Sequence, residues 1–144
     1  MLFISATRLR VRSILYLPAF FRANQGASKQ LIISPGFIDG KELIDKKFTF
    51  WTLTRWADAA SMKGFRNSPD HRKAMQKLPL WCDEASYLHW EDDSGQLPSW
   101  EIVREKMISE GKLTKVQKPS KDQLSKNYGV IKWKRLERKF KPSR

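Results

Sequence analysis

The chain has 144 residues, a formal net charge of +13 and a single cysteine, Cys82. This length suits one domain with a sizeable core, and one cysteine excludes an internal disulfide framework and is typical of a reducing compartment. No apolar run approaches the roughly 18 residues that a membrane-spanning helix needs. We therefore expect a small cytoplasmic domain.

The positive charge is concentrated near the C-terminal end. Residues 112–144 contain twelve Lys or Arg and two acidic residues, which leaves +10 on this segment and about +3 on the rest. A basic tail can bind nucleic acid, with Trp133 and Phe140 as stacking surfaces, or it can be a solvated arm. Because the body carries so little net charge, we expect a solvated arm and no nucleic-acid partner.

The first elements are a strand and a helix. Residues 2–11 have the two-residue alternation of a strand, and Ser13 can cap a helix over residues 14–29. Pro18 falls near the first turn of this helix, where proline is best tolerated. The same proline interrupts an apolar run that follows three arginines, which argues against a signal peptide.

The next two strands are expected to form a hairpin. Residues 37–45 predict a fairly polar strand, in which Gly40 indicates a bulge or a close approach. Residues 48–56 have a β-branched or aromatic residue at most positions, which is typical of a strand buried on both faces. Two lysines make a tight connection between these strands.

Two short helices and a fourth strand follow the hairpin. Asp58 can cap the first helix, and a Ser-Pro pair starts the second one. On the second helix, His71, Met75 and Leu78 stand at i, i+4 and i+7, so they share one face. Residues 84–90 then predict a strand.

The order strand, helix, strand, strand, helix, strand is the split βαβ arrangement of a ferredoxin-like α+β fold. Its helices cover one face of an antiparallel sheet. Both faces of the central strand, residues 48–56, are apolar or aromatic, and no second helical layer is in reach to cover the other face. We therefore predict a homodimer that packs sheet against sheet.

An extra C-terminal helix and a basic tail complete the chain. Residues 98–110 predict the helix, and Gly111 predicts its end. Beyond it, residues 130–140 alternate apolar and basic side chains, so they either lie along the body as a strand or contact the partner subunit. We expect one domain over residues 1–111 and a basic extension over residues 112–144.

Three blocks carry a family likeness: FWTLTRW, AASMKGFRNSPDHRKAM and WCDEASYLHW. In this order they resemble a bacterial family of unassigned function related to the antibiotic biosynthesis monooxygenases and, more distantly, spheroidene monooxygenase. The likeness covers residues 1–92 and the helix after Leu97. It implies a dimeric α+β barrel. It leaves the chemistry open, because such relatives include cofactor-free oxygenases, haem enzymes, isomerases and proteins without known activity.

His71 is the sharpest candidate for chemistry. A helix histidine that faces the sheet can act as a general base or ligate haem iron, and the resemblance implies an axial haem ligand near this position. His71 can equally be a structural residue at the start of its helix. Arg55, Arg66 and Arg72 could pair with haem propionates or an acidic substrate, or form a solvated helix face.

Trp51 and Asn67 are a second candidate set. In cofactor-free relatives a tryptophan and an asparagine help to activate a phenolic substrate, and these two residues are the nearest equivalents here. The alternatives are core packing for Trp51 and a cap or loop role for Asn67. We interpret His89 as structural or interfacial, and Cys82 beside Asp83 as a poor nucleophile.

No phosphate-binding, zinc-hydrolase or kinase motif occurs in the sequence. We therefore predict a monooxygenase-like oxidoreductase with a hydrophobic or aromatic substrate between sheet and helices, with haem as one option for its cofactor. The alternative is a non-enzymatic dimeric module that binds a ligand. A pocket packed solid by Trp51, Met62, Phe65 and Met75 would favour the module, and an open cavity lined by His71 would favour the enzyme.

Overall fold

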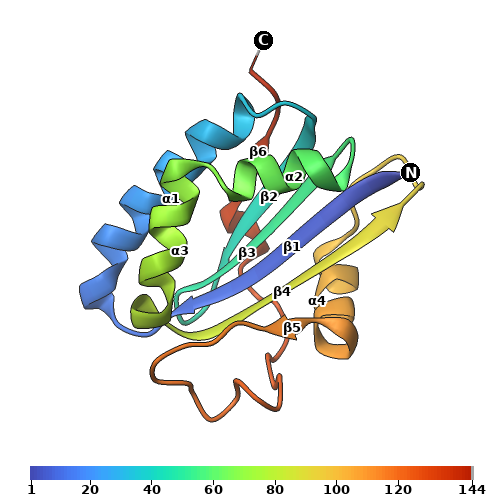
Figure 1. The fold of residues 1–144 in the computed structure, drawn as a ribbon. Helices are drawn as coiled ribbons and strands as arrows, with labels where there is room; N and C mark the ends of the chain where they lie inside the picture. Colours follow the sequence, from blue (N-terminus) through green and yellow to red (C-terminus); the bar gives the residue numbers. More distant parts are fainter. Residues whose placement is uncertain (144) are drawn as a thin grey trace.

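The computed structural model describes residues 1–143. Its centre is a six-stranded sheet in the order β5-β4-β1-β3-β2-β6, and every neighbouring pair is antiparallel. Three helices cover one face of this sheet (Figure 1). The predicted ferredoxin-like α+β fold with an extra C-terminal helix is confirmed.

The strands are β1 (Leu2–Val11), β2 (Phe37–Asp45), β3 (Thr49–Trp56), β4 (Cys82–Asp92), β5 (Lys112–Leu113) and β6 (Glu137–Phe140). The helices are α1 (Leu17–Ile32), α2 (Ala59–Arg66), α3 (Pro69–Trp81) and α4 (Trp100–Glu110), with 3₁₀ turns at Ile14–Tyr16 and Lys134–Leu136. None of the helices in residues 1–143 is long and apolar enough to cross a membrane.

Local chemistry explains several of these boundaries. The carboxylate of Asp58 accepts a hydrogen bond from the backbone N–H of Ser61 at 2.8 Å, so it caps α2 as predicted. The expected close approach at Gly40 is also present. A Cβ atom on Gly40 would lie 2.8 Å from the carbonyl oxygen of Leu53, so β2 and β3 meet at a distance that only glycine allows.

The alternation of β1 and β3 sorts their side chains onto two faces. Ser5 and Thr7 face α1 and α3, whereas Ile4 lies on the opposite face. The opposite face is not open. There, Trp51 is 1% exposed and packs in one cluster with Met107 of α4 and with Tyr128.

The sequence prediction that no second layer of the same chain covers this face is therefore wrong. After β4 the chain reverses direction, and α4 packs on this face of the sheet. Residues 114–133, which we call the arm, then continue over the same face. The predicted homodimer through the sheet face rested on that face being uncovered. In the single chain described by residues 1–143, α4 and the arm occupy it instead.

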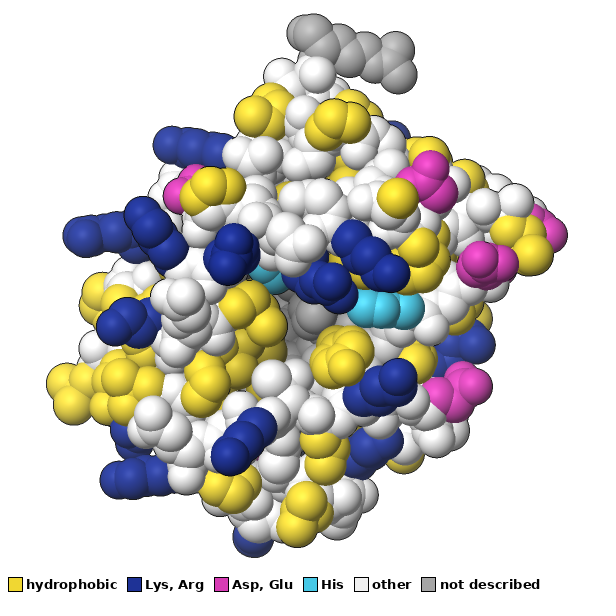
Figure 2. All heavy atoms as spheres, in the orientation of Figure 1, with side chains coloured by type: hydrophobic (Ala, Val, Ile, Leu, Met, Phe, Trp, Pro, Cys, Tyr) yellow, Lys and Arg dark blue, Asp and Glu magenta, His cyan; other side chains and the backbone are white. Residues whose placement is uncertain are grey.

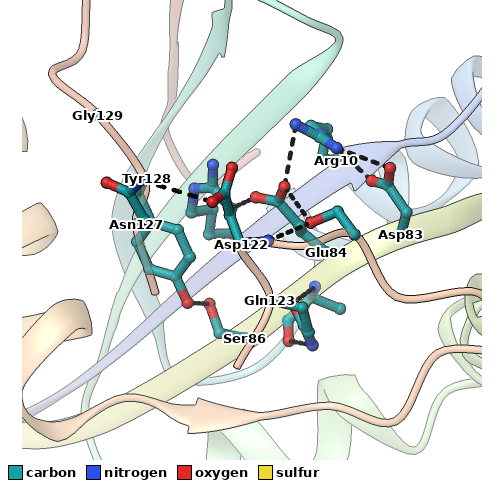
Figure 3. A network of polar contacts seen from close by, with 12 residues as sticks. Arg10, Asp83, Glu84, Ser86, Asp122, Gln123, Asn127, Tyr128 and Gly129 are labelled. Atoms are coloured by element: carbon teal, nitrogen blue, oxygen red, sulfur yellow. Dashed lines mark hydrogen bonds and ion pairs between the residues drawn. The ribbon is translucent and has the colours of Figure 1, made fainter. Parts of the chain in front are cut away.

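The arm itself is anchored by hydrogen bonds, shown in Figure 3. The Gln123 side chain accepts from the Ala85 backbone N–H at 3.0 Å and donates to the Ala85 carbonyl at 3.1 Å. The Tyr128 hydroxyl lies 3.1 Å from Ser86 Oγ. Farther on, Phe140 of β6 pairs with β2. The sequence left open whether residues 130–140 lie along the body as a strand or contact a partner subunit. In this chain, β6 lies along the body as a strand.

A buried ion pair lies under the arm. Arg8 Nη1 donates to Glu84 Oε1 at 2.6 Å, and the Arg8 guanidinium stands 3.9 Å from the centre of the Tyr128 ring. Burial lowers the pKa of Arg8, and the contact with Glu84 offsets part of this effect. The pair therefore joins β1, β4 and the arm on the face of the sheet that α4 covers, which we call the second face.

Candidate functional site

A cavity of about 540 Å³ lies between the sheet and the helices α1, α2 and α3. Its floor consists of Ser5 and Thr7 on β1 and of Thr52 and Thr54 on β3, which are direct neighbours in the register. Because these side chains are small, they leave space between the sheet and the helices. The cavity walls are mainly apolar and come from Leu9, Phe20, Leu31, Met62, Phe65, Met75, Leu78, Trp81 and Phe140.

Figure 2 shows one face of the molecule, on which the surface is hollowed. Histidine side chains lie beside the hollow, and Lys and Arg side chains gather next to them. The two histidines of the chain, His71 and His89, both line the cavity.

His71 stands in the first turn of α3 and faces the cavity, as its helical spacing predicts. Its ring meets the ring of Phe65 edge to face, with 4.9 Å between the centres. Burial lowers the pKa of His71; a contact with the Arg66 backbone raises it in part, and the Arg66 charge lowers it again. Nδ1 is buried and has no hydrogen-bond partner within residues 1–143. A neutral imidazole can accept a proton at one of its ring nitrogens.

His89 is a cavity residue that the sequence interpretation missed. It lies on β4 opposite Ser5, with its ring 5.3 Å from Phe3 and 5.5 Å from Tyr87. Burial lowers the pKa of His89, and three nearby cations, Arg66, Lys112 and Lys63, lower it further. The signal was present in the register, because a β4 residue paired with Ser5 must share its face.

Glu42 is the second residue that was missed. It is 4% exposed on β2 and lines the cavity as a buried carboxylate. Asn24 of α1 donates to one carboxylate oxygen at 2.9 Å, and Arg138 of β6 donates to the other at 3.2 Å. These contacts satisfy the charge at this end of the cavity.

The second candidate set, Trp51 and Asn67, does not reach the cavity. Trp51 lies on the opposite face of β3, because odd and even positions of a strand point to opposite sides. The expectation that it lines the site beside His71 is corrected accordingly. Asn67 is an exposed residue at the C-terminal end of α2 and does not line the cavity either.

The residues expected to hold haem do not all come together at the cavity. Arg55 is bound on the second face to Asp39 by two hydrogen bonds of 2.8 Å, and Arg72 is exposed outside the cavity lining. Of the residues expected to hold haem, His71 and Arg66 line the cavity. Within residues 1–143, no group of three or more His, Cys, Asp or Glu is placed to hold a metal ion.

Cys82 lies outside the cavity lining, buried at the start of β4. Burial, together with the charge of Asp83, raises the pKa of its thiol to about 12. The thiolate that a nucleophilic mechanism needs is therefore scarce at neutral pH, in agreement with the sequence interpretation.

Residues 20–77 match the family model described as antibiotic biosynthesis monooxygenase. The predicted resemblance is confirmed. The matched segment runs from α1 to α3, so it contains His71 and most of the cavity wall. No curated protein matches the chain significantly.

Solved structures share the fold at low sequence identity. A Nitrosomonas europaea protein provisionally assigned to the antibiotic biosynthesis monooxygenases is 12% identical, with a TM-score of 0.58 over 66% of this chain and 93% of that one. A conserved protein from Methanosarcina mazei is 14% identical (TM-score 0.57, 65% and 94% covered). SnoaB, a cofactor-independent oxygenase from Streptomyces nogalater, is also 14% identical (0.55, 68% and 98%). At these low identities, the TM-scores show a shared fold alone.

Proposed function

We propose that the protein is a cofactor-independent oxygenase whose hydrophobic or aromatic substrate binds in the cavity beneath α1 and α3. The observation that carries this proposal is an apolar cavity lined by a half-buried histidine, His71, whose pKa is lowered by burial. The shared fold with SnoaB supports it, since that protein is a cofactor-independent oxygenase.

In this mechanism His71 is the general base. Since its pKa is lowered, the imidazole is neutral at pH 7 and can take a proton from an acidic C–H group of the substrate. The carbanion then supplies the electrons that reduce O₂. A CH₂ group becomes C=O; one oxygen atom enters the product, and the other leaves as water with the two hydrogens. His71 returns its proton to that water.

The apolar cavity wall keeps water away from the substrate. Apolar side chains such as Phe65 and Leu78 surround the position that a substrate would occupy. In such surroundings a carbanion is protected from competing protonation, and the interactions of polar groups are strengthened. Ser5 and Thr7 on the floor offer hydroxyl groups to an oxygen of the substrate.

Dithranol, an anthrone with an acidic CH₂ group, is a suitable probe for this proposal. We expect the purified protein to consume O₂ with dithranol and to form the corresponding anthraquinone, measured with an oxygen electrode and by absorbance. Replacing His71 by Gln should reduce the rate by about 10²–10⁴-fold. Arg72→Gln, one position along α3 and outside the cavity lining, is the matched control and should retain the rate.

The second candidate is a ligand-binding module without catalytic activity. Binding of dithranol without O₂ consumption would support that candidate and contradict the oxygenase.

The assembly is a separate part of the proposal. We infer a homodimer, and because α4 covers the second face, its subunits would meet on another surface or exchange the arm. Light scattering of the purified protein measures the mass of the particle in solution, which should be twice that of one chain.

A further inference from the structure

We propose that the natural ligand of the cavity is an amphipathic acid, with its apolar body under α1 and α3 and its carboxylate at the mouth beside Arg66. This inference rests on the proposed use of the cavity as a binding site. It adds the chemical class of the ligand and the direction in which the ligand lies.

The mouth of the cavity carries a cluster of cations. Arg66 lines the cavity, and Lys63 lies with it in the last turn of α2. Lys112 of β5 pairs with Tyr87, itself a lining residue, so it flanks the same end. None of these three cations forms an ion pair with another described residue of the chain. Figure 2 shows Lys and Arg side chains gathered over the hollow beside the histidines.

Like charges held together without a counter-ion repel one another, and the two neighbouring histidines do not relieve this repulsion. The same three cations lie close enough to His89 that, after burial, Arg66, Lys112 and Lys63 each lower the pKa of its ring. An anion bound at this position would remove the repulsion and gain charge-assisted hydrogen bonds from the Arg66 guanidinium. The mouth is therefore complementary to a carboxylate.

At the β2 side of the cavity, the described lining residues offer no unpaired cation to an anion. Glu42 is the one carboxylate among the described lining residues, and its two oxygens already accept from Asn24 and Arg138. A second carboxylate near Glu42 would therefore find the Arg138 guanidinium already paired. The charges at the two ends thus give the ligand one orientation, with the acid at the mouth and the apolar part inside.

The size of the cavity agrees with this class of ligand. A volume of about 540 Å³ falls within the range of about 300–1,000 Å³ found for small-molecule sites. The walls between the two ends are aliphatic and aromatic, including Met75, Leu78 and Phe20. A fused aromatic ring system or an aliphatic chain with one acidic group fits this site, because its apolar part can pack on the walls and its carboxylate can contact the cations at the mouth.

A displacement assay with a matched pair of ligands tests the proposal. N-phenyl-1-naphthylamine, whose fluorescence rises in apolar sites, reports occupancy of the cavity, and anthracene-9-carboxylate and 9-anthracenemethanol compete with it. The two competitors share the ring system and differ in the charge. We expect the acid to bind about tenfold more tightly than the alcohol, as one charge-assisted contact supplies. Added salt should lower the affinity for the acid and leave the affinity for the alcohol unchanged.

Three variants locate the effect. Arg66→Gln should bring the acid to the affinity of the alcohol without changing binding of the alcohol, and Arg66→Lys should retain part of the preference. Arg72→Gln is the control, because it removes an exposed arginine that lies outside the lining. Equal affinity of acid and alcohol for the unaltered protein would overturn the inference, and so would a preference that persists in Arg66→Gln. Either result leaves the cavity as a binding site; failure of the fluorophore to bind would refute the proposed function as well.

Discussion

Met107 offers a sharp test of how α4 covers the sheet. Its side chain is 0% exposed and packs in the cluster that contains Trp51, Leu53 and Tyr128. Replacing a fully buried methionine by alanine removes buried apolar area and leaves a cavity, which costs about 2–5 kcal/mol. Because domains unfold with about 5–15 kcal/mol, we expect Met107→Ala to lower the midpoint of urea unfolding markedly, with an unchanged slope.

Ile102 provides the matched control on the same helix. It is 47% exposed on α4, so Ile102→Ala should change the free energy of unfolding by about 0.5 kcal/mol or less. Tryptophan fluorescence follows both transitions. Equal effects of the two substitutions would refute the packing of α4 on the second face. If α4 packed on a partner subunit instead, the effect of Met107→Ala would depend on protein concentration.

Histidines, glycines and the cysteine give three further predictions. Because burial lowers the pKa of His71 and of His89 in the folded state, the unfolded chain binds more protons below about pH 6.5, so the free energy of unfolding should fall as the pH drops through that value and level off above it. Urea unfolding from pH 5 to 8 measures this, and His71→Gln should flatten the curve. Gly64 lies within α2, and a methyl group added to it would meet no other heavy atom within 4 Å, so Gly64→Ala should stabilise the protein by about 0.5–1 kcal/mol. Gly40→Ala should instead destabilise it, because the new methyl group would strike a carbonyl oxygen of β3; thermal unfolding compares the two, and equal effects would contradict the close approach. Cys82, buried and with its pKa raised to about 12, should react with iodoacetamide at pH 7.5 only after unfolding, as mass spectrometry can show.

Much of the fold could be predicted because its signals are local. The two-residue alternation of β1 defined its faces, Asp58 caps its helix through its own side chain, and the spacing on α3 predicted that His71 faces the cavity. Each of these features depends on residues within one or two turns of one another, where the periodicity of the chain determines which side chains share a face.

The remaining features depend on contacts between distant segments. Arg138 reaches Glu42 from 96 residues away, and neither position suggests the other in the sequence. In β3 both sets of alternating residues are large or β-branched, so the pattern did not say whether Trp51 or Thr52 would face the cavity. The return of α4 over the sheet is likewise a tertiary contact that no local spacing encodes.

The most direct test of the central claim is the pH dependence of O₂ consumption with dithranol, compared between the unaltered protein and His71→Gln. If His71 is the base, kcat/KM should rise with pH to a plateau, with a midpoint below the ordinary histidine pKa of about 6.5. One O₂ should be consumed for each anthraquinone formed, and His71→Gln should lose both the rate and the plateau. A rate that keeps rising to pH 9, or a profile that His71→Gln leaves unchanged, would contradict the assignment of His71 as the catalytic base.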